Sequence, residues 1–214
     1  MRSAVLDVPA PPAHLVADWE REVCLQLNLA PGDVEALSLP RARMRWPDYR
    51  SCVQAMSRWM DGMGLAGVLA RSDMALMACR GARYHHDGMH YGGSAFCNLF
   101  ISEDKGLDVH FPTTGHRIPL TRGTALLFDT CQPHAVIPRD RNHFEAVDFA
   151  SGLDCTQVFL TWELPIEDTG VARQLGLRFD TCPLPVPHAP GDQVWLNGEP
   201  AAVRPESGLW CRAD

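Results

Sequence analysis

The apolar positions in the first third of the chain recur with a helical period. His14–Leu27 carries apolar side chains four residues apart, which predicts an amphipathic helix: Leu15, Trp19, Val23 and Leu27. A Pro-Gly-Asp break at 31–33 follows, and Asp33 is placed to cap a short helix over Val34–Leu39. Tyr49–Leu65 keeps the helical period again, with a Met and aromatic stripe that is typical of a packed core face.

From about residue 73 the pattern changes to short apolar runs separated by Gly, Pro and Asp. We expect strands at Met74–Cys79, Ala82–His86, Ser94–Ile101, Leu107–Phe111, Arg117–Leu120, Thr124–Phe128, His134–Ile137, Phe144–Phe149 and Thr156–Leu164. Strands at this spacing predict a sandwich or barrel of the jelly-roll kind. The chain is therefore predicted to be an α+β protein, mainly β, in which N-terminal helices buttress the jelly roll.

One domain is expected, in three parts. Residues 1–72 would form the helical support, residues 73–165 the jelly-roll core, and residues 166–214 a C-terminal extension. The tail from Asp180 is rich in Pro and Gly. We expect it to pack as a loop with a hairpin around Asn197-Gly198, or to form an arm.

Composition narrows the classes of function. The 214 residues are 46% hydrophobic and 21% charged, which indicates a sizeable core and argues against wholesale disorder. The net charge is −7 and no basic run offsets it, so a nucleic-acid partner is disfavoured. No apolar segment is long enough for a membrane span, and Met1–Ala13 does not resemble a signal peptide. We expect a soluble cytoplasmic protein whose eight cysteines are mostly buried free thiols.

A candidate metal site begins in the segment Arg83-Tyr84-His85-His86-Asp87-Gly88. Side chains at i and i+2 of a strand share a face, so His85 and Asp87 should project together and His86 to the other side. Gly88 would end the strand. One imidazole and one carboxylate make two thirds of a facial triad for iron. His90 is a less suitable ligand, because its spacing from His86 suits a helix.

A third ligand is expected at His134, in the segment Pro133-His134-Ala135-Val136. The stretch after Gly115 predicts a turn, a buried strand and a second turn that lead to this histidine. A later strand can therefore return His134 to the side of His85 and Asp87. Three protein ligands on one face would leave positions open for oxygen and an organic cosubstrate.

These motifs resemble the Fe(II)- and 2-oxoglutarate-dependent oxygenases, with their His-x-Asp … His motif on a double-stranded β-helix. The resemblance covers roughly residues 74–164 and includes the segments Gly123–Phe128 and Pro133–Val136. It implies Fe(II) as the metal, O2 and 2-oxoglutarate as cosubstrates, and succinate as a product. Related halogenases have a small residue at the carboxylate position, so Asp87 favours hydroxylation, or desaturation or cyclisation. The expected substrate is a small molecule such as an amino acid or a natural-product intermediate.

The resemblance also implies a basic residue that binds the distal carboxylate of 2-oxoglutarate, on a strand after the second histidine. Gln157 stands where an arginine would be expected. We expect Arg141 to take this role, with Arg139 as the alternative, because an arginine fork meets a carboxylate bidentately. Basic residues elsewhere remain open: Arg80, Arg83, Arg117 and Arg122. Asn98 and Tyr84 are candidates for hydrogen bonds to the cosubstrate.

Two other classes of protein fit the same pattern. A cupin-type metalloenzyme also places histidines and a carboxylate on jelly-roll strands, and it would need neither 2-oxoglutarate nor an arginine at position 157. A non-catalytic binding protein could have kept the fold, although the intact triad argues against it. His110 and Asp108 share one face of Leu107–Phe111, which we interpret as a solvated strand face.

Overall fold

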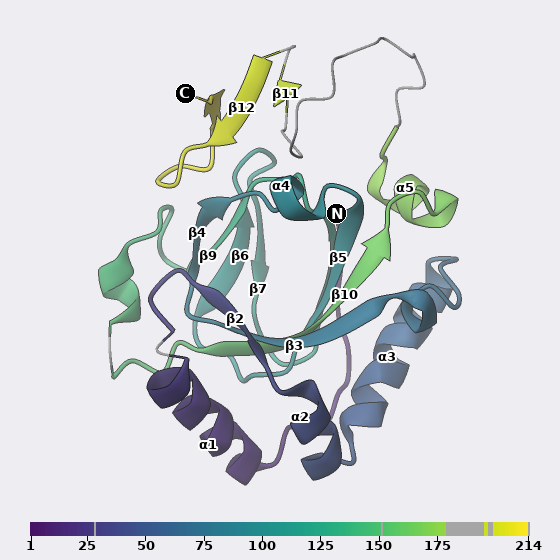
Figure 1. The fold of residues 1–214 in the computed structure, drawn as a ribbon, viewed down its shortest axis with the longest axis vertical. Coiled ribbons are helices and arrows are strands. Elements are labelled where there is room, and N and C mark those ends of the chain that lie inside the picture. The colour runs from purple at the N-terminus through teal and green to yellow at the C-terminus, as the bar shows by residue number, and fades with distance from the viewer. Residues whose placement is uncertain (28, 151, 179–194, 197–198, 214) are drawn as a thin grey trace.

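The computed structural model describes residues 1–27, 29–150, 152–178, 195–196 and 199–213. Two antiparallel sheets form its centre, and a smaller sheet lies at the C-terminal end (Figure 1). The larger sheet has six strands in the order β1 (Arg2–Val5), β8 (Thr124–Asp129), β5 (Ser94–Phe100), β10 (Gln157–Pro165), β3 (Asp73–Cys79) and β2 (Val34–Leu37). The four-stranded sheet has the order β4 (Ala82–His85), β9 (His134–Pro138), β6 (Leu107–Phe111) and β7 (His116–Pro119). The C-terminal sheet consists of β11 (Trp195–Leu196), β12 (Glu199–Val203) and β13 (Trp210–Arg212).

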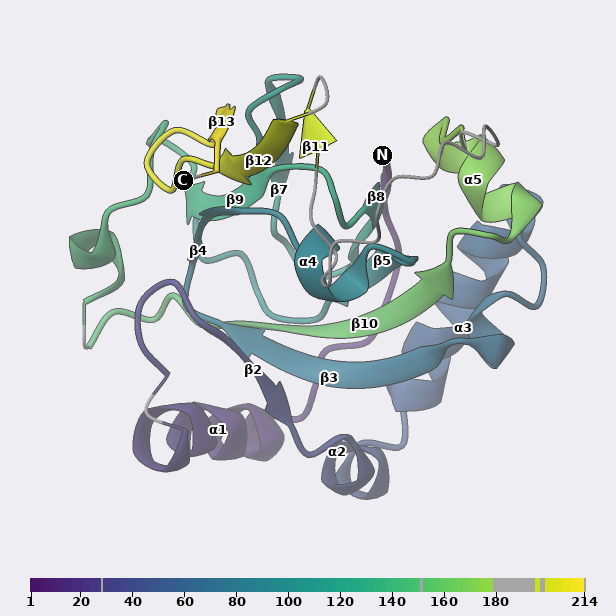
Figure 2. The same cartoon turned by 45° about the horizontal axis from the view of Figure 1, so that its top comes forward.

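Helices cover the outer face of the six-stranded sheet (Figure 2). They are α1 (Ala13–Arg21), which continues as a π-helical turn over Glu22–Gln26, α2 (Leu39–Arg45) and α3 (Tyr49–Gly62). Short 3-10 turns occur at Leu69–Arg71 and Ala146–Phe149, and the remaining helices are α4 (Gly88–Tyr91) and α5 (Thr169–Leu175). Alternate residues of β5, β8 and β10 pack against these helices, including the fully buried Cys97, Leu127 and Leu160. The N-terminal helices therefore support the sheet, as the pattern predicts.

The other face of the six-stranded sheet packs on the four-stranded sheet through a second apolar cluster. Its aromatic members are Phe100, Phe111, Phe128, Phe149 and Phe159. Edge-to-face and tilted ring contacts link them, for example Phe111 to Phe128 with ring centroids 5.6 Å apart. This cluster fills the space between the sheets and ends beside the candidate metal site.

The mainly β class with N-terminal helices is confirmed, and most predicted strands occur within a residue or two of their expected ends. The helix predicted over Val34–Leu39 is wrong. Val34–Leu37 instead pairs with β3 as an edge strand, since β3 offers unpaired backbone groups there. No helix was predicted at α2 and no strand at β1.

The strand predicted over Phe144–Phe149 is also wrong. The rings of Phe144 and Phe149 stack in parallel, with centroids 5.2 Å apart and an interplanar angle of 12°. Residues five apart in a strand face opposite sides, so this stacking requires the chain to turn, as it does in the 3-10 turn at Ala146–Phe149. Phe149 also occupies the space beside Gly81, where a Cβ would lie 2.5 Å from the ring.

The C-terminal segment packs on the outer face of the four-stranded sheet. Tyr84 donates its backbone N–H to the carbonyl of Pro205, and Gly208 lies so close to the Tyr84 ring that a Cβ would be 2.4 Å from it. The pairing of Leu196 with Glu199 agrees with the expected hairpin, although its turn at 197–198 lies outside the described residues. Among the described helices, none is long and apolar enough to cross a membrane.

Candidate metal centre

Two neighbouring strands bring the predicted ligands together. His85 ends β4 and lies opposite His134, the first residue of β9, in the antiparallel register. Asp87 is not on the strand, because β4 ends at His85 and Asp87 precedes α4 as its N-cap residue. The backbone N–H of Asp87 donates to the carbonyl of Thr130 at 2.8 Å, which ties this turn to the β8–β9 connection. The turn therefore brings Asp87 beside His85, rather than the strand alternation that we expected.

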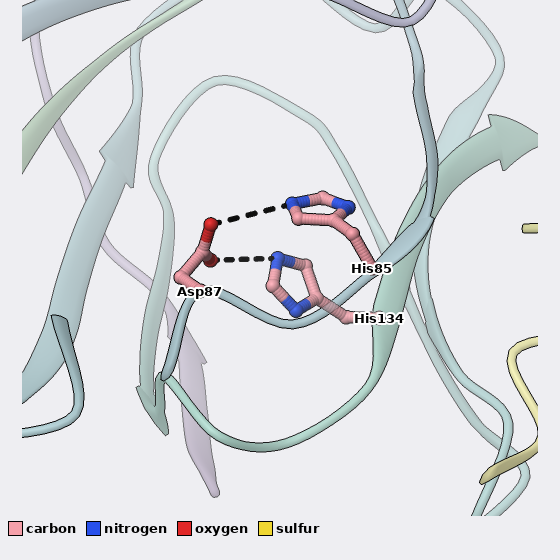
Figure 3. A group of neighbouring side chains, drawn as sticks. All are labelled: His85, Asp87 and His134. Carbon is pink, nitrogen blue, oxygen red and sulfur yellow. Dashed lines mark ion pairs between the residues drawn. The ribbon is translucent and has the colours of Figure 1, made fainter. Parts of the chain in front are cut away.

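The three side chains converge on one small volume (Figure 3). One potential ligand atom from each of His85, Asp87 and His134 lies within 4.8 Å of the others. Nε2 of His85 is 3.5 Å from Oδ1 of Asp87, and Nε2 of His134 is 3.5 Å from Oδ2. The two imidazole rings are tilted against each other, with centroids 4.5 Å apart. The structure thus juxtaposes two nitrogens and a carboxylate, as the motif predicts.

Backbone carbonyls orient both imidazoles. Nδ1–H of His85 donates to the carbonyl of Arg83 at 2.6 Å, and Nδ1–H of His134 donates to the carbonyl of Gln132 at 3.0 Å. In both cases the acceptor is two residues earlier in the chain. These bonds select the tautomer whose Nε2 carries a lone pair directed at the centre of the triad.

Burial keeps the imidazole of His134 neutral. Its side chain packs against Phe128 and Phe111, whose ring centroids lie 4.8 and 5.9 Å away. Burial, with a smaller contribution from the nearby His85, lowers the pKa of His134 to about 3, so His134 is unprotonated at neutral pH. Loss of solvation raises the pKa of Asp87, against the opposing influence of His85. A divalent cation would offset this cost of burying the carboxylate.

The arginines predicted to bind the cosubstrate are engaged elsewhere. Arg139 donates from Nε to Asp108 at 2.9 Å and from its terminal nitrogens to Asp104. Asp108 alternates on β6 with Val109, which lies in the cluster between the sheets, so Asp108 and its partners are on the outer face. Arg141 pairs with Asp148 at 3.5 Å. The structure does not bring Arg139 or Arg141 to the triad, because Arg139 pairs with Asp104 and Asp108 and Arg141 pairs with Asp148.

Tyr84 is likewise directed away from the triad. Its ring is buried on the outer face of the four-stranded sheet with Ala135 and Ile137. The Tyr84 hydroxyl lies 2.6 Å from Nδ1 of His110 and donates to the carbonyl of Asn142 at 3.1 Å. The face that carries His110 and Asp108 is therefore a buried hydrogen-bonded network and not the solvated strand face that we expected.

Neutral amides lie between the two sheets. Asn98 is only 7% exposed, pairs with Thr161 across β5 and β10, and has no hydrogen-bond partner for Oδ1 among the described residues. Gln157 is fully buried at the start of β10, donates to the carbonyl of Leu120 at 3.5 Å, and leaves its Oε1 without a described partner. Both acceptors are available to a polar ligand or to water.

Two features of the site were not foreseen from the sequence. His86 is not one of the three converging side chains, and its ring is 5.2 Å from Trp210 of β13, which brings the C-terminal sheet to the rim of the site. A groove of about 520 Å³ opens beside the ligands and is lined by residues 32–35, Arg83, Tyr84, His85, Asp87 and Pro205. No local signal in the sequence connects residues 32–35 or 205 with the metal motif, because tertiary packing alone places them there.

Comparison with known proteins gives structural neighbours only. No protein-family model and no curated protein matches the chain. A prolyl-4-hydroxylase from Pseudomonas putida is 17% identical, with 77% of this chain and 91% of that chain covered and a TM-score of 0.45. The α-ketoglutarate-dependent epimerase SnoN from nogalamycin biosynthesis is 14% identical, with coverages of 74% and 76% and a TM-score of 0.36.

The polyketide cyclase RemF from Streptomyces resistomycificus is a further neighbour, with 11% identity over 44% of this chain and a TM-score of 0.30. The matched region spans about half of RemF, 54% of its length. The neighbours thus include a prolyl hydroxylase and a 2-oxoglutarate-dependent epimerase, and the His-x-Asp … His triad is present in this chain.

Proposed function

We propose that this protein is a mononuclear non-haem iron oxygenase in which His85, Asp87 and His134 hold Fe(II), with O2 and 2-oxoglutarate as cosubstrates. The two facing antiparallel sheets would be the two halves of a double-stranded β-helix. The observation that carries the proposal is the convergence of two oriented Nε2 atoms and one carboxylate oxygen within 4.8 Å. Two imidazoles and one carboxylate are the ligand set of non-haem ferrous oxygenases.

The residues present fit such a metal. Neutral imidazoles and a carboxylate neutralise part of the charge of Fe(II) and leave positions open for other ligands. Bound iron would supply oxygen activation. The protein contributes the remaining parts: the Arg83 and Gln132 carbonyls orient the imidazoles, and Phe111 and Phe128 keep water from one side of His134.

The reaction we propose is hydroxylation of a small molecule, or desaturation or cyclisation. Asp87 supports this choice, because it fills the carboxylate position that a halogenase would leave to halide. The net charge of −7 supports a small-molecule substrate, such as an amino acid or natural-product intermediate, over nucleic acid.

A metalloenzyme that does not use 2-oxoglutarate is the second candidate. A buried carboxylate requires a cation or several donors. The polar side chains that we find between the sheets, Asn98, Thr161 and Gln157, are neutral, and both predicted arginines are engaged on other surfaces. This placement favours the second candidate unless a cation outside the inter-sheet space serves the cosubstrate.

Anaerobic reconstitution followed by cosubstrate turnover separates the candidates. Purified protein is loaded with Fe(II) and ascorbate, exposed to O2 and 2-oxoglutarate with a panel of small molecules, and assayed for succinate. The proposal predicts metal-dependent succinate release that Asp87→Ala abolishes. Stoichiometric iron binding without any binding or turnover of 2-oxoglutarate would favour the second candidate, and absence of metal binding would reject both.

A further inference from the structure

A cross-strand row of side chains leads away from the metal centre along the six-stranded sheet. Phe128 of β8 lies opposite Phe96 of β5 in the antiparallel register. Phe96 lies opposite Glu163 of β10, and Glu163 lies opposite Asp73 of β3. The residues on either side of Phe96 and of Glu163 belong to the helix-facing cluster, so both side chains are directed towards the four-stranded sheet. The row therefore begins with two aromatic rings and ends with two carboxylates.

The aromatic half of this row lies beside two of the proposed metal ligands. The centroid of the Phe128 ring is 4.8 Å from that of His134 and 6.0 Å from that of Phe96. Phe96 also contacts Tyr91 of α4, with centroids 4.9 Å apart, and Asp87 is the N-cap residue of this helix. Figure 2 shows α4 on the side of the six-stranded sheet opposite α1. Since Tyr91 is 38% exposed and Phe96 is only partly buried, both rings can contact an apolar molecule beside the metal.

The acidic half of the row places two carboxylates together without a cation. Glu163 and Asp73 occupy directly opposed positions, where like charges destabilise a sheet. Partial burial and the neighbouring Asp73 raise the pKa of the Glu163 carboxyl. Within the described part of the chain neither carboxylate forms an ion pair, in contrast to Asp108 of β6, which pairs with two arginines. A cationic ligand would offset the repulsion between Glu163 and Asp73.

A buried amide on the next row indicates a ligand with hydrogen-bond donors. Asn98 lies opposite Thr161, two residues before Glu163 on β10, so Asn98 and Glu163 are diagonal neighbours on the same face. Asn98 is 7% exposed, and its Oδ1 has no partner among the described residues. An ammonium group has three donors and no acceptor. It therefore matches a surface whose free acceptors are carboxylate and carbonyl oxygens.

We propose that the molecule oxidised at this centre is a small amine, whose ammonium group binds Glu163 and Asp73 and whose apolar part lies over Phe96. This inference rests on the proposed metal centre. Neighbouring strands are about 4.8 Å apart, so Glu163 is about 10 Å from Phe128 along the row. The carbon that reacts is therefore several bonds away from the nitrogen. The faces of Phe96 and Tyr91 favour both an apolar stem and a nearby positive charge.

Calorimetric titration of Co(II)-loaded protein with matched ligands tests the need for the positive charge. Phenethylamine is compared with 2-phenylethanol, and L-lysine with L-norleucine, because the second compound of each pair lacks one ammonium group. The wild type should bind at least one amine about tenfold more tightly than its counterpart. Glu163→Gln should remove most of this preference and leave the affinity for the counterpart unchanged. Asp73→Asn should have the same effect to a smaller extent, since Asp73 is exposed.

Asp33→Asn is the matched control, because it removes a carboxylate from the groove at the other end of β3. Residues 32–35 lie beside the Cys79 end of β3, whereas Asp73 begins the strand about 20 Å away. This variant should keep the preference for amines. Glu163→Gln relieves a repulsion, so its Tm should not fall below that of the wild type. If it nevertheless does not fold, Asp73→Asn carries the test.

Line broadening in the NMR spectrum of phenethylamine, caused by Mn(II)-loaded protein, tests the orientation. The ring protons should broaden more than the methylene protons next to nitrogen. The reverse order would place the nitrogen at the metal and overturn the inference.

Metal binding is measured first, so that the two levels of the account can fail separately. Failure of the wild type to bind Co(II) overturns the proposed function. With normal Co(II) binding, only the amine inference is overturned if no amine is preferred or if Glu163→Gln keeps the full preference. It is also overturned if Glu163→Gln weakens the neutral counterpart equally, or if Asp33→Asn causes the same loss.

Discussion

Acidification of the metal-free protein from pH 7 to pH 5 is expected to lower its free energy of unfolding through His134. Burial lowers the pKa of this imidazole to about 3, whereas an unfolded histidine has its ordinary value near 6.5. Between these values the unfolded chain binds the proton and the folded chain does not, so His134 makes stability fall as the pH falls. Proton linkage between pH 7 and pH 5 lowers the free energy of unfolding by about 2 kcal/mol, which corresponds to a fall of roughly 4–8 °C in Tm.

The assay is urea unfolding of the metal-free protein at pH 7 and pH 5, repeated with His134→Gln. The substitution itself changes packing against Phe111 and Phe128, so only the pH-dependent difference is compared. We expect the variant to lose about 2 kcal/mol less than the wild type over this range. Equal losses in the two proteins would refute the reasoning, because they would show that His134 does not resist protonation in the folded state. The raised pKa of Asp87 acts in the opposite direction, since protonation of that carboxyl is easier in the folded chain.

Three further predictions test other parts of the structure. Asp87→Asn keeps the shape of the side chain but removes its charge. The affinity for Mn(II), measured by calorimetry, should therefore fall by more than the ~10–100-fold that is typical of losing a residue that only supports a ligand. An unchanged affinity would exclude Asp87 as a ligand. Asp108 is 3% exposed and pairs with two arginines. Asp108→Ala should therefore lower the free energy of unfolding, measured in urea, by about 3 kcal/mol, while the affinity for Mn(II) stays normal. A loss below about 1 kcal/mol would contradict a buried network at this position. Gly123 has φ +90, and a Cβ there would lie 2.0 Å from the Leu6 carbonyl oxygen, whereas Gly115 has φ +67 and open space around it. Gly123→Ala should therefore lower the free energy of unfolding by more than about 2 kcal/mol, and Gly115→Ala by about 1 kcal/mol. Equal losses would show that the close approach to Leu6 has no energetic consequence.

Local sequence patterns predicted the elements that show either a helical period of apolar residues or a short apolar run between turn residues. The strands Ser94–Phe100, Thr124–Asp129 and Gln157–Pro165 have both faces in apolar surroundings, so they read in the sequence as short, nearly continuous apolar runs bounded by turn residues. Val34–Leu37 follows a Pro-Gly-Asp break that suits a helix start, but pairing with β3 overrides this local preference. Edge pairing depends on a partner distant in sequence and has no local signal.

The residues of the candidate metal site could be predicted from the sequence, but their geometry could not. His85, Asp87 and His134 have the right types and spacing, yet a turn bound to Thr130 positions Asp87. The cosubstrate arginines illustrate the limit more sharply. Proximity in sequence to His134 favoured Arg139 and Arg141, whereas Asp104, Asp108 and Asp148 determine where their side chains lie. Arg83 lines the groove because residues 32–35 pack beside it, which only the tertiary structure reveals.

Anomalous diffraction from crystals of the protein grown with Mn(II), as a redox-stable substitute for Fe(II), tests the central claim most directly. The account predicts one anomalous peak bounded by Nε2 of His85, a carboxylate oxygen of Asp87 and Nε2 of His134, at distances of about 2.0–2.3 Å. A fully occupied Mn(II) bound by other residues, or no peak at the triad despite saturating metal, would contradict the assignment of this site.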